Sequence, residues 1–180
     1  GFGIRDGHWL SSNLRRFNDT NIRINDITTQ YGVINLAGPL ARKVLEKVCT
    51  HDVSHAGFAF MTARGIQIGH APVLAFRVSY IGEIGWELYI PIEFVHYVYE
   101  LLDGAGREFD ISNIGYRAID SLRIEKRFLA WGTDLSPDYN PLEAGLGFLI
   151  DWRKNDFLGA EALRRIKDEG VKRKLVCLAL

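Results

Sequence analysis

Hydrophobic and polar positions along the chain follow two different periods, and each period predicts one kind of element. Alternating positions, or a short apolar run bounded by breakers, are typical of a β-strand. Strands are predicted at Tyr31–Leu36, Val73–Tyr80, Trp86–Ile90, Gly145–Asp151 and Lys174–Leu180. The pattern between these segments is ambiguous from His51 to Gly69, where two further short strand pieces fit at Met61–Thr62 and Gly65–Gly69.

Apolar residues that recur three and four positions apart predict amphipathic helices. Helices are predicted at His8–Asn18, Pro39–Val48, Glu93–Phe109, Gly115–Phe128 and Phe157–Asp168. In the second of these helices, Leu40, Val44 and Val48 share one face. The central order of elements is strand, helix, two strands joined by a short loop, and helix. This order is typical of an α+β fold in which an antiparallel sheet carries its helices on one face.

Composition excludes several classes of protein. The 180 residues include 22 basic and 22 acidic side chains, so the net charge is +0. Proteins that neutralise nucleic-acid phosphates usually show a basic excess, and therefore we expect no nucleic-acid partner. Apolar runs are too short to cross a membrane, so no membrane association is expected. Cys49 and Cys177 are far apart and form no CxxC motif, which favours two reduced thiols in a reducing compartment.

Most motifs of cofactor and metal chemistry are missing from the sequence. His51 and His55 have the H-x3-H spacing of a helical metal site, but no third ligand of the HExxH kind accompanies them, so no metal site is expected. The chain contains neither a GxGxxG turn nor a phosphate-binding Walker A loop. We therefore expect no flavin or nucleotide to bind within this chain, and we assign no catalytic residue.

The hairpin in the middle of the chain carries the strongest candidate chemistry, although its pattern alone is that of an ordinary solvated hairpin. Alternation places Trp86 and Leu88 on one face of the strand, and Glu87 and Tyr89 on the other. A carboxylate on a rigid strand can accept hydrogen bonds from two adjacent N–H donors. The aminopyrimidinone edge of a pterin presents such donors, and Tyr80 and Trp86 would supply flat walls.

Three segments, in this order, resemble the folate-binding aminomethyltransferase domain known from the glycine cleavage T-protein. Tyr80–Glu87 resembles the GYTGExGxE element of that family, with Ser79 and Ile81 departing from its first Gly and its Thr. Leu122–Glu125 resembles the SLRLE helix, and Pro141–Leu146 resembles the TPxEAGL loop. The resemblance implies the α+β fold of that domain and tetrahydrofolate as its cofactor.

In detail, the amino-acid sequence is most similar to the C-terminal half of the sarcosine dehydrogenases, with the dimethylglycine dehydrogenases a close second. This similarity rests on Gly115–Lys126, Asn140–Phe148 and Phe157–Leu180. The resemblance implies that FAD, in a flavin domain of the same polypeptide, oxidises an N-methyl amine. Tetrahydrofolate then captures the one-carbon unit as 5,10-methylenetetrahydrofolate. The implied partners are therefore folate, the small one-carbon substrate and the flavin domain.

The resemblance also assigns folate-binding residues. It places the pterin contact at Tyr80 and Glu87, which we expect to border one pocket, with Trp86, Glu83 and Arg123 nearby.

Three of the family's functional residues have no counterpart here, among them a folate-contacting Arg that lies downstream of this chain. The T-protein has an Arg just before the Asp-Ser of its helix, where this chain has Ile119, so that contact is either lost or replaced by Arg117 or Arg123. Asp120 is expected to be structural. The catalytic Asp of the family lies in a segment upstream of this chain, which implies that the chain alone is inactive.

The expected organisation has three parts. Residues 1–30 would be the remnant of a preceding subdomain, residues 31–150 the folate-binding core, and residues 151–180 the start of a C-terminal barrel-like domain. Two alternatives remain open: a non-catalytic homologue, such as the regulatory subunit of pyruvate dehydrogenase phosphatase, and a stand-alone aminomethyltransferase. The resemblance implies the mitochondrial matrix for a eukaryotic protein and the cytoplasm for a bacterial one.

Overall fold

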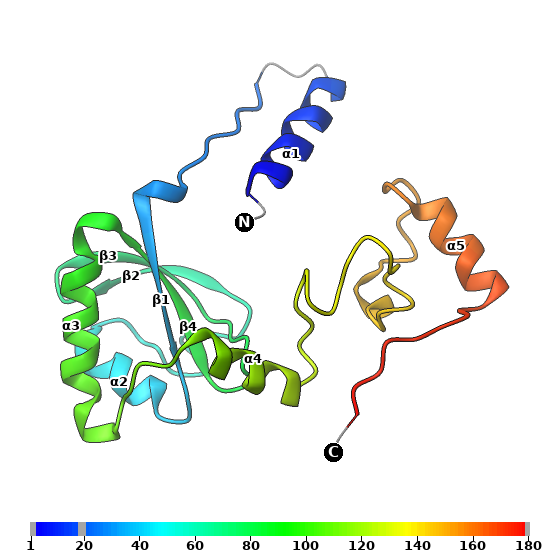
Figure 1. Ribbon diagram of the computed structural model, residues 1–180. Coiled ribbons are helices and arrows are strands. Elements are labelled where there is room, and N and C mark those ends of the chain that lie inside the picture. The colour runs from blue at the N-terminus through cyan, green and yellow to red at the C-terminus, as the bar shows by residue number, and fades with distance from the viewer. Residues whose placement is uncertain (1–2, 18–20, 179–180) are drawn as a thin grey trace.

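A four-stranded antiparallel sheet forms the centre of the molecule (Figure 1). The computed structural model describes residues 3–17 and 21–178. The strands are β1 (Tyr31–Ala37), β2 (Ala63–Ile68), β3 (Ala71–Phe76) and β4 (Gly85–Pro91), and they are arranged in the order β1-β4-β3-β2. All three neighbouring pairs are antiparallel, which confirms the predicted α+β class.

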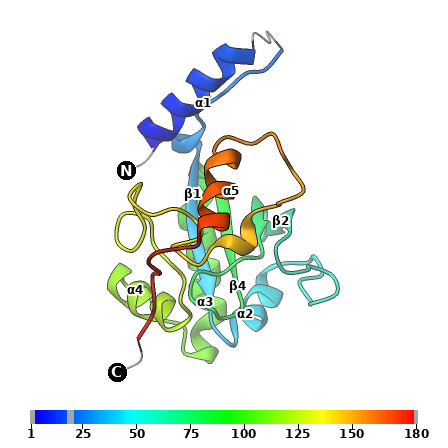
Figure 2. The same cartoon turned by 90° about the vertical axis from the view of Figure 1, so that its right-hand side faces the viewer.

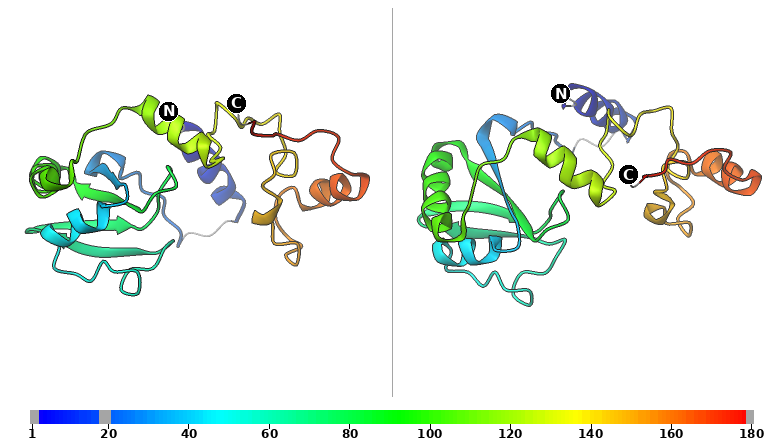
Figure 3. Two further views of the ribbon diagram at one scale, coloured as in Figure 1. Left: turned by 90° about the horizontal axis from the view of Figure 1, so that it is seen from below. Right: turned by 60° about the horizontal axis from the view of Figure 1, so that its bottom comes forward.

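Two helices cover one face of this sheet. They are α2 (Ala41–Val48) and α3 (Val95–Gly106), which contact each other, and α3 also contacts β1 and β4 (Figure 3). The strand β4 shows why the helices lie on this side. Its residues Trp86, Leu88 and Ile90 are buried, whereas the intervening residues are only partly buried. The predicted alternation is therefore confirmed, and it defines a helix-covered inner face and an outer face of the sheet.

The remaining helices lie outside this core. They are α1 (Gly3–Phe17), α4 (Tyr116–Glu125) and α5 (Ala160–Glu169). Short 3-10 turns lie at Thr28–Gln30, Ile92–Phe94, Arg107–Phe109 and Gly147–Leu149. Helix α1 lies beyond the end at which β1 begins (Figure 2), and α5 stands apart from the sheet (Figure 1). Among the described residues, no helix combines the length and the apolar character that a membrane crossing requires.

Several predicted boundaries were wrong. The first predicted helix begins earlier, at Gly3, and its predicted last residue, Asn18, lies outside the described residues. The strand predicted at Val73–Tyr80 ends at Phe76, and the rest belongs to the hairpin loop.

Two predicted strands near the C-terminus were also wrong. A 3-10 turn replaces the strand predicted at Gly145–Asp151. Residues 174–178 form no ladder, while residues 179–180 lie outside the described part. A strand requires a neighbouring strand with which to exchange hydrogen bonds. Here Leu175 makes one backbone hydrogen bond, to the carbonyl of Glu143 at 2.8 Å.

Candidate functional site

The loop between β3 and β4 carries Tyr80, whose side chain lies against the segment that follows α4. The Tyr80 hydroxyl donates to the backbone carbonyl of Leu129 at 2.9 Å. Its ring stacks on that of Phe128, with 6.1 Å between the ring centroids and 13° between the planes. Burial is the main cause that raises the pKa of Tyr80, so the phenol remains a donor at neutral pH. The hairpin loop is therefore fastened to residues 128–129.

Gly82 explains how closely this loop approaches α4. Its φ is +75°, a conformation that side chains disfavour. A Cβ atom at this position would lie 2.4 Å from the side chain of Lys126. The positive φ therefore favours glycine, and a larger residue would also displace the Lys126 side chain.

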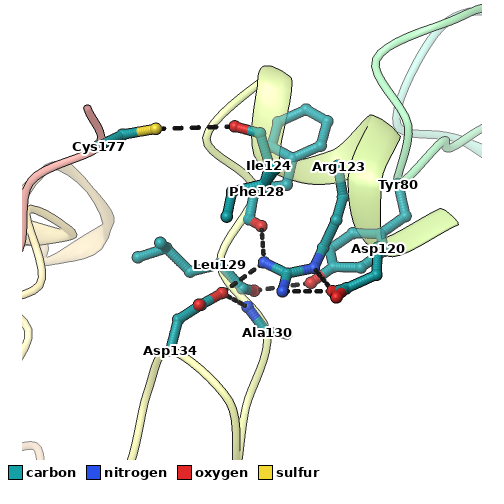
Figure 4. Close-up of polar contacts among 9 residues, drawn as sticks. All are labelled: Tyr80, Asp120, Arg123, Ile124, Phe128, Leu129, Ala130, Asp134 and Cys177. Carbon is teal, nitrogen blue, oxygen red and sulfur yellow. Dashed lines mark hydrogen bonds and ion pairs between the residues drawn. The ribbon is translucent and has the colours of Figure 1, made fainter. Parts of the chain in front are cut away.

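A buried arginine organises the segment after α4 (Figure 4). Only 2% of Arg123 is exposed. Its Nε donates to Asp120 at 2.7 Å, and its Nη1 donates to the carbonyl of Phe128 at 2.8 Å and to Asp134. Asp134 also accepts from the backbone N–H of Ala130 at 2.8 Å. Burial alone would lower the pKa of Arg123, but its hydrogen bonds to the two carboxylates raise it above the ordinary value.

The assignment of Arg123 to folate binding meets a geometric obstacle. Its guanidinium group is buried and already donates to two carboxylates and a carbonyl, so it is not free for a ligand. Its partner Asp120 therefore has a structural contact. Arg117 is exposed on α4, one turn from Asp120, and Ile119 is half-buried.

An open cavity of about 410 Å³ lies beside Tyr80, between the hairpin loop, the segment after α4 and the Ala144–Phe148 loop. Its lining is mainly apolar and aromatic, with two cations. The lining residues are Ser79, Tyr80, Lys126, Arg127, Phe128, Leu129, Leu135, Ala144, Gly145, Leu146 and Phe148. Glu87 is not among them, so Tyr80 and Glu87 do not share this cavity.

Glu87 lies on the outer face of the sheet, at the centre of β4. It is half-buried, and one of its carboxylate oxygens, Oε2, accepts from the hydroxyl of Tyr89 at 3.3 Å. Its direct neighbours across the sheet are Asn35 on β1 and Phe76 on β3. Within the described part of the chain, no cation forms an ion pair with Glu87.

Trp86 points to the opposite face and belongs to the core. It is 1% exposed, and its ring meets the edge of Phe58 at 6.4 Å between centroids. It therefore does not form a flat wall beside Tyr80, and its contribution is to anchor β4. Glu83 is exposed in the hairpin loop.

The two histidines of the H-x3-H pair lie in separate surroundings. His51 contacts Cys49 and the backbone N–H of Gln67, whereas His55 lies 3.3 Å from the Nη1 of Arg77. The residues that the structure describes contain no group of three or more His, Cys, Asp or Glu side chains placed to hold a metal ion.

Sequence reasoning did not single out Asp134 or Tyr89. Asp134 joins a buried arginine 11 positions away, a contact for which the sequence has no local signal. Tyr89 was placed on the same face as Glu87, and that alternation was the available signal for their contact.

Comparison with known proteins gives the family. Residues 1–154 match the GCVT N-terminal domain, and the chain belongs to this family. It is 42% identical to mouse dimethylglycine dehydrogenase over the whole chain, which covers 21% of that protein. It is 41% identical to human sarcosine dehydrogenase over 86% of the chain and 17% of that protein. It is also 35% identical to the regulatory subunit of mouse pyruvate dehydrogenase phosphatase, over 96% of the chain and 20% of that protein. The chain thus spans about a fifth of the length of these relatives.

Proposed function

We propose that this chain is the folate-binding region of a flavin-dependent dehydrogenase that acts on sarcosine or dimethylglycine. In this proposal, tetrahydrofolate receives the one-carbon unit that leaves the oxidised amine. The FAD belongs to another part of the same polypeptide, since the sequence of this chain holds no dinucleotide-binding turn. By itself, the chain would not oxidise the amine. We propose the mitochondrial matrix for a eukaryotic protein, as in the relatives named mitochondrial, and the cytoplasm for a bacterial one.

The observation that supports this proposal best is the environment of the Glu87 carboxylate. Its carboxylate lies half-buried on the sheet, where the buried Trp86 and Leu88 hold the strand in place. It has no cationic partner among the described residues, so its charge is available to a ligand. Hydrogen bonds to an ionised carboxylate are about twice as strong as neutral ones. The amino and ring N–H groups of a pterin fit this acceptor as a pair.

The chemistry that bound tetrahydrofolate supplies is the capture of a one-carbon unit by its reduced ring nitrogens. The residues proposed here bind and orient it. Tyr80 and its cavity lie at one end of the hairpin, and Glu87 lies on the strand that follows, so the same element positions both.

Replacing Glu87 by Gln tests the proposal. The substitution exchanges one acceptor oxygen for an NH2 donor, so one pterin N–H faces another donor and loses its partner. An unpaired buried polar group costs about 1–3 kcal/mol. We therefore expect tetrahydrofolate affinity to fall by roughly ten- to a hundred-fold. Calorimetry on the protein at its full natural length, beside a melting curve, measures both effects.

Glu93→Gln is the matched control, because Glu93 is an exposed glutamate just after the same strand. Weaker folate binding in Glu87→Gln, with an unchanged melting temperature and a neutral control, supports the proposal. An unchanged affinity would show that Glu87 is only a strand residue. A collapsed melting temperature would show that its role is structural.

The likeness to the phosphatase regulatory subunit favours a second candidate, a non-catalytic regulatory protein. The two candidates differ in a direct measurement. The dehydrogenase, at its full length, oxidises sarcosine or dimethylglycine with an electron acceptor. The regulatory protein does not, even where it retains folate binding.

A further inference from the structure

The outer face of the sheet places three different chemical groups in one row across three strands. Asn35 on β1 pairs with Glu87 on β4, and Phe76 on β3 pairs with Glu87 from the other side. Side chains directly opposite one another in antiparallel strands have Cβ atoms about 4.5–5.5 Å apart. An amide, a carboxylate and an aromatic ring are thus held side by side by the backbone register.

The adjacent row gives this carboxylate its orientation. Tyr89 follows Glu87 by two positions on the same face, and its hydroxyl donates to Glu87 Oε2 at 3.3 Å. The Tyr89 ring also contacts that of Phe76, with 5.0 Å between centroids. Burial, followed by the Glu87 charge, raises the pKa of Tyr89, so its hydroxyl remains a donor at neutral pH.

Asn35 is exposed, and its side-chain amide makes no hydrogen bond within the described part of the chain. On the far side of Phe76, the two nearest β2 residues that share this face are small. Ala63 pairs with Phe76, and a Cβ atom at Gly65 would meet nothing within 4 Å. The row is therefore open to a flat molecule lying over the sheet.

A pterin presents three groups in sequence along one edge: an amino N–H, a ring N–H and a carbonyl oxygen. The two donors match the carboxylate of Glu87, and the third group, an acceptor, requires a donor beside that carboxylate. We propose that Asn35 donates its amide N–H to the ring carbonyl of the pterin, and that Tyr89 is a positioning residue that fixes the carboxylate of Glu87. This inference rests on the proposed folate function and adds the residues that select a 4-oxo ring.

The charges in this row favour a ligand that presents an uncharged hydrogen-bonding edge, as the pterin ring does. The row contains one carboxylate and no cation. An anionic group such as a phosphate or a carboxylate would face Glu87 without compensation. A donor–donor–acceptor edge instead satisfies both Glu87 and Asn35.

Selectivity between two ring types provides the test. A 4-thioxo analogue of tetrahydrofolate keeps the ring N–H for Glu87 but has sulfur, a weak acceptor, in place of the carbonyl oxygen, so it gains little from the N–H of Asn35. We expect Asn35→Leu to weaken tetrahydrofolate binding about ten-fold and to change binding of the 4-thioxo analogue much less, because the 4-oxo ligand loses the stronger hydrogen bond. Gln67→Leu, which removes an amide from the same face three strands away from Asn35, is the control and should change neither affinity.

A double-mutant cycle tests Tyr89. Tyr89→Phe keeps the ring and removes the hydroxyl that holds Glu87, so folate affinity should fall several-fold in the natural sequence and not at all in Glu87→Ala, which has no side-chain acceptor. A purely structural role of Tyr89 would give the same loss in both backgrounds. The measurements use the protein at its full natural length, with calorimetry for each ligand.

The outcomes separate the two proposals. No folate binding by the natural protein, or an unchanged affinity in Glu87→Gln, overturns the folate function and with it this inference. A loss in Glu87→Gln combined with an unchanged 4-oxo to 4-thioxo affinity ratio in Asn35→Leu leaves the folate function standing and overturns the role of Asn35. Equal losses in both backgrounds of the cycle overturn the role of Tyr89.

Discussion

Arg123 is a buried cation whose charge is balanced by carboxylates from two segments. Asp120 lies one turn away on the same helix, while Asp134 comes from the loop that Arg123 holds. Burying a charge is costly unless its partners are complete, so removal of one partner destabilises more than the pair itself contributes. Because Tyr80 donates to the carbonyl of Leu129 in the same loop, this ion-pair network also supports the wall of the Tyr80 cavity.

Asp134→Asn should therefore lower the free energy of unfolding by about 1–3 kcal/mol, since Arg123 loses one of its two charged partners while buried. Urea unfolding followed by circular dichroism measures the change. Asp103→Asn is the control, because Asp103 pairs with Arg107 at the surface, where such pairs contribute about 0–1 kcal/mol. Equal effects of the two substitutions would contradict the role assigned to Asp134.

At the scale of elements, the Pro141–Leu146 loop is held by one glutamate. Glu143 accepts from Arg173 at 2.8 Å and from the backbone N–H of Asn140 at 3.1 Å, and its carbonyl accepts from Leu175. The hydrogen bond from Arg173, followed by the one from Asn140, lowers the pKa of Glu143 below its ordinary value of 4.5. These contacts fasten the C-terminal segment to the loop that borders the Tyr80 cavity.

The sign of the pH dependence follows from the lowered pKa of Glu143. The stabilising contribution is complete above the ordinary value of 4.5 and is lost as the pH falls through the lower, folded-state value. We expect hydrogen exchange in residues 171–178 to accelerate as the pH is lowered through that range, after correction for intrinsic exchange rates. In Glu143→Gln, exchange should be faster at neutral pH, and this acid-induced step should disappear. A variant that keeps the step would assign it to another group.

At the scale of the whole molecule, stability is distributed unevenly. The main hydrophobic cluster, with the partly buried residues packed against it, extends from Ile34 to Ile111 and includes the inner faces of the sheet, α2 and α3. Among the side chains that the structure describes, helices α1, α4 and α5 contribute none to it. Several large apolar side chains outside the cluster are exposed, among them Phe148 at 80% and Leu158 at 72%.

Native-state hydrogen exchange should therefore distinguish a part of the chain with a high free energy of opening from a part with a lower one. Amides of β4 and α3 are expected to exchange only through global unfolding, whereas those of α5 should open at lower free energy, because few buried contacts hold that helix. Mass spectrometry of peptic peptides resolves these regions. Equal protection of α5 and β4 would show that the chain unfolds as one cooperative unit.

The sequence alone determined the features that depend on local periodicity. Alternation in β4 established that Trp86 faces the core and Glu87 the other side, because successive side chains of a strand must point to opposite faces. The order of elements predicted the antiparallel α+β sheet, and the sequence motifs predicted the family to which the chain belongs.

Contacts between distant segments were decided only by the tertiary structure. The strands predicted near the C-terminus have no partner strand among the described residues, and an apolar run does not reveal whether a partner exists. Arg123 is a residue type that often binds anionic ligands, yet its guanidinium group already donates to Asp134 and to the carbonyl of Phe128. The row of Asn35, Glu87 and Phe76 likewise exists only because the register of three strands places it there. Local sequence specifies the face of the strand on which a side chain lies. Its neighbours on that face depend on which distant segments pair with the strand, and in which register.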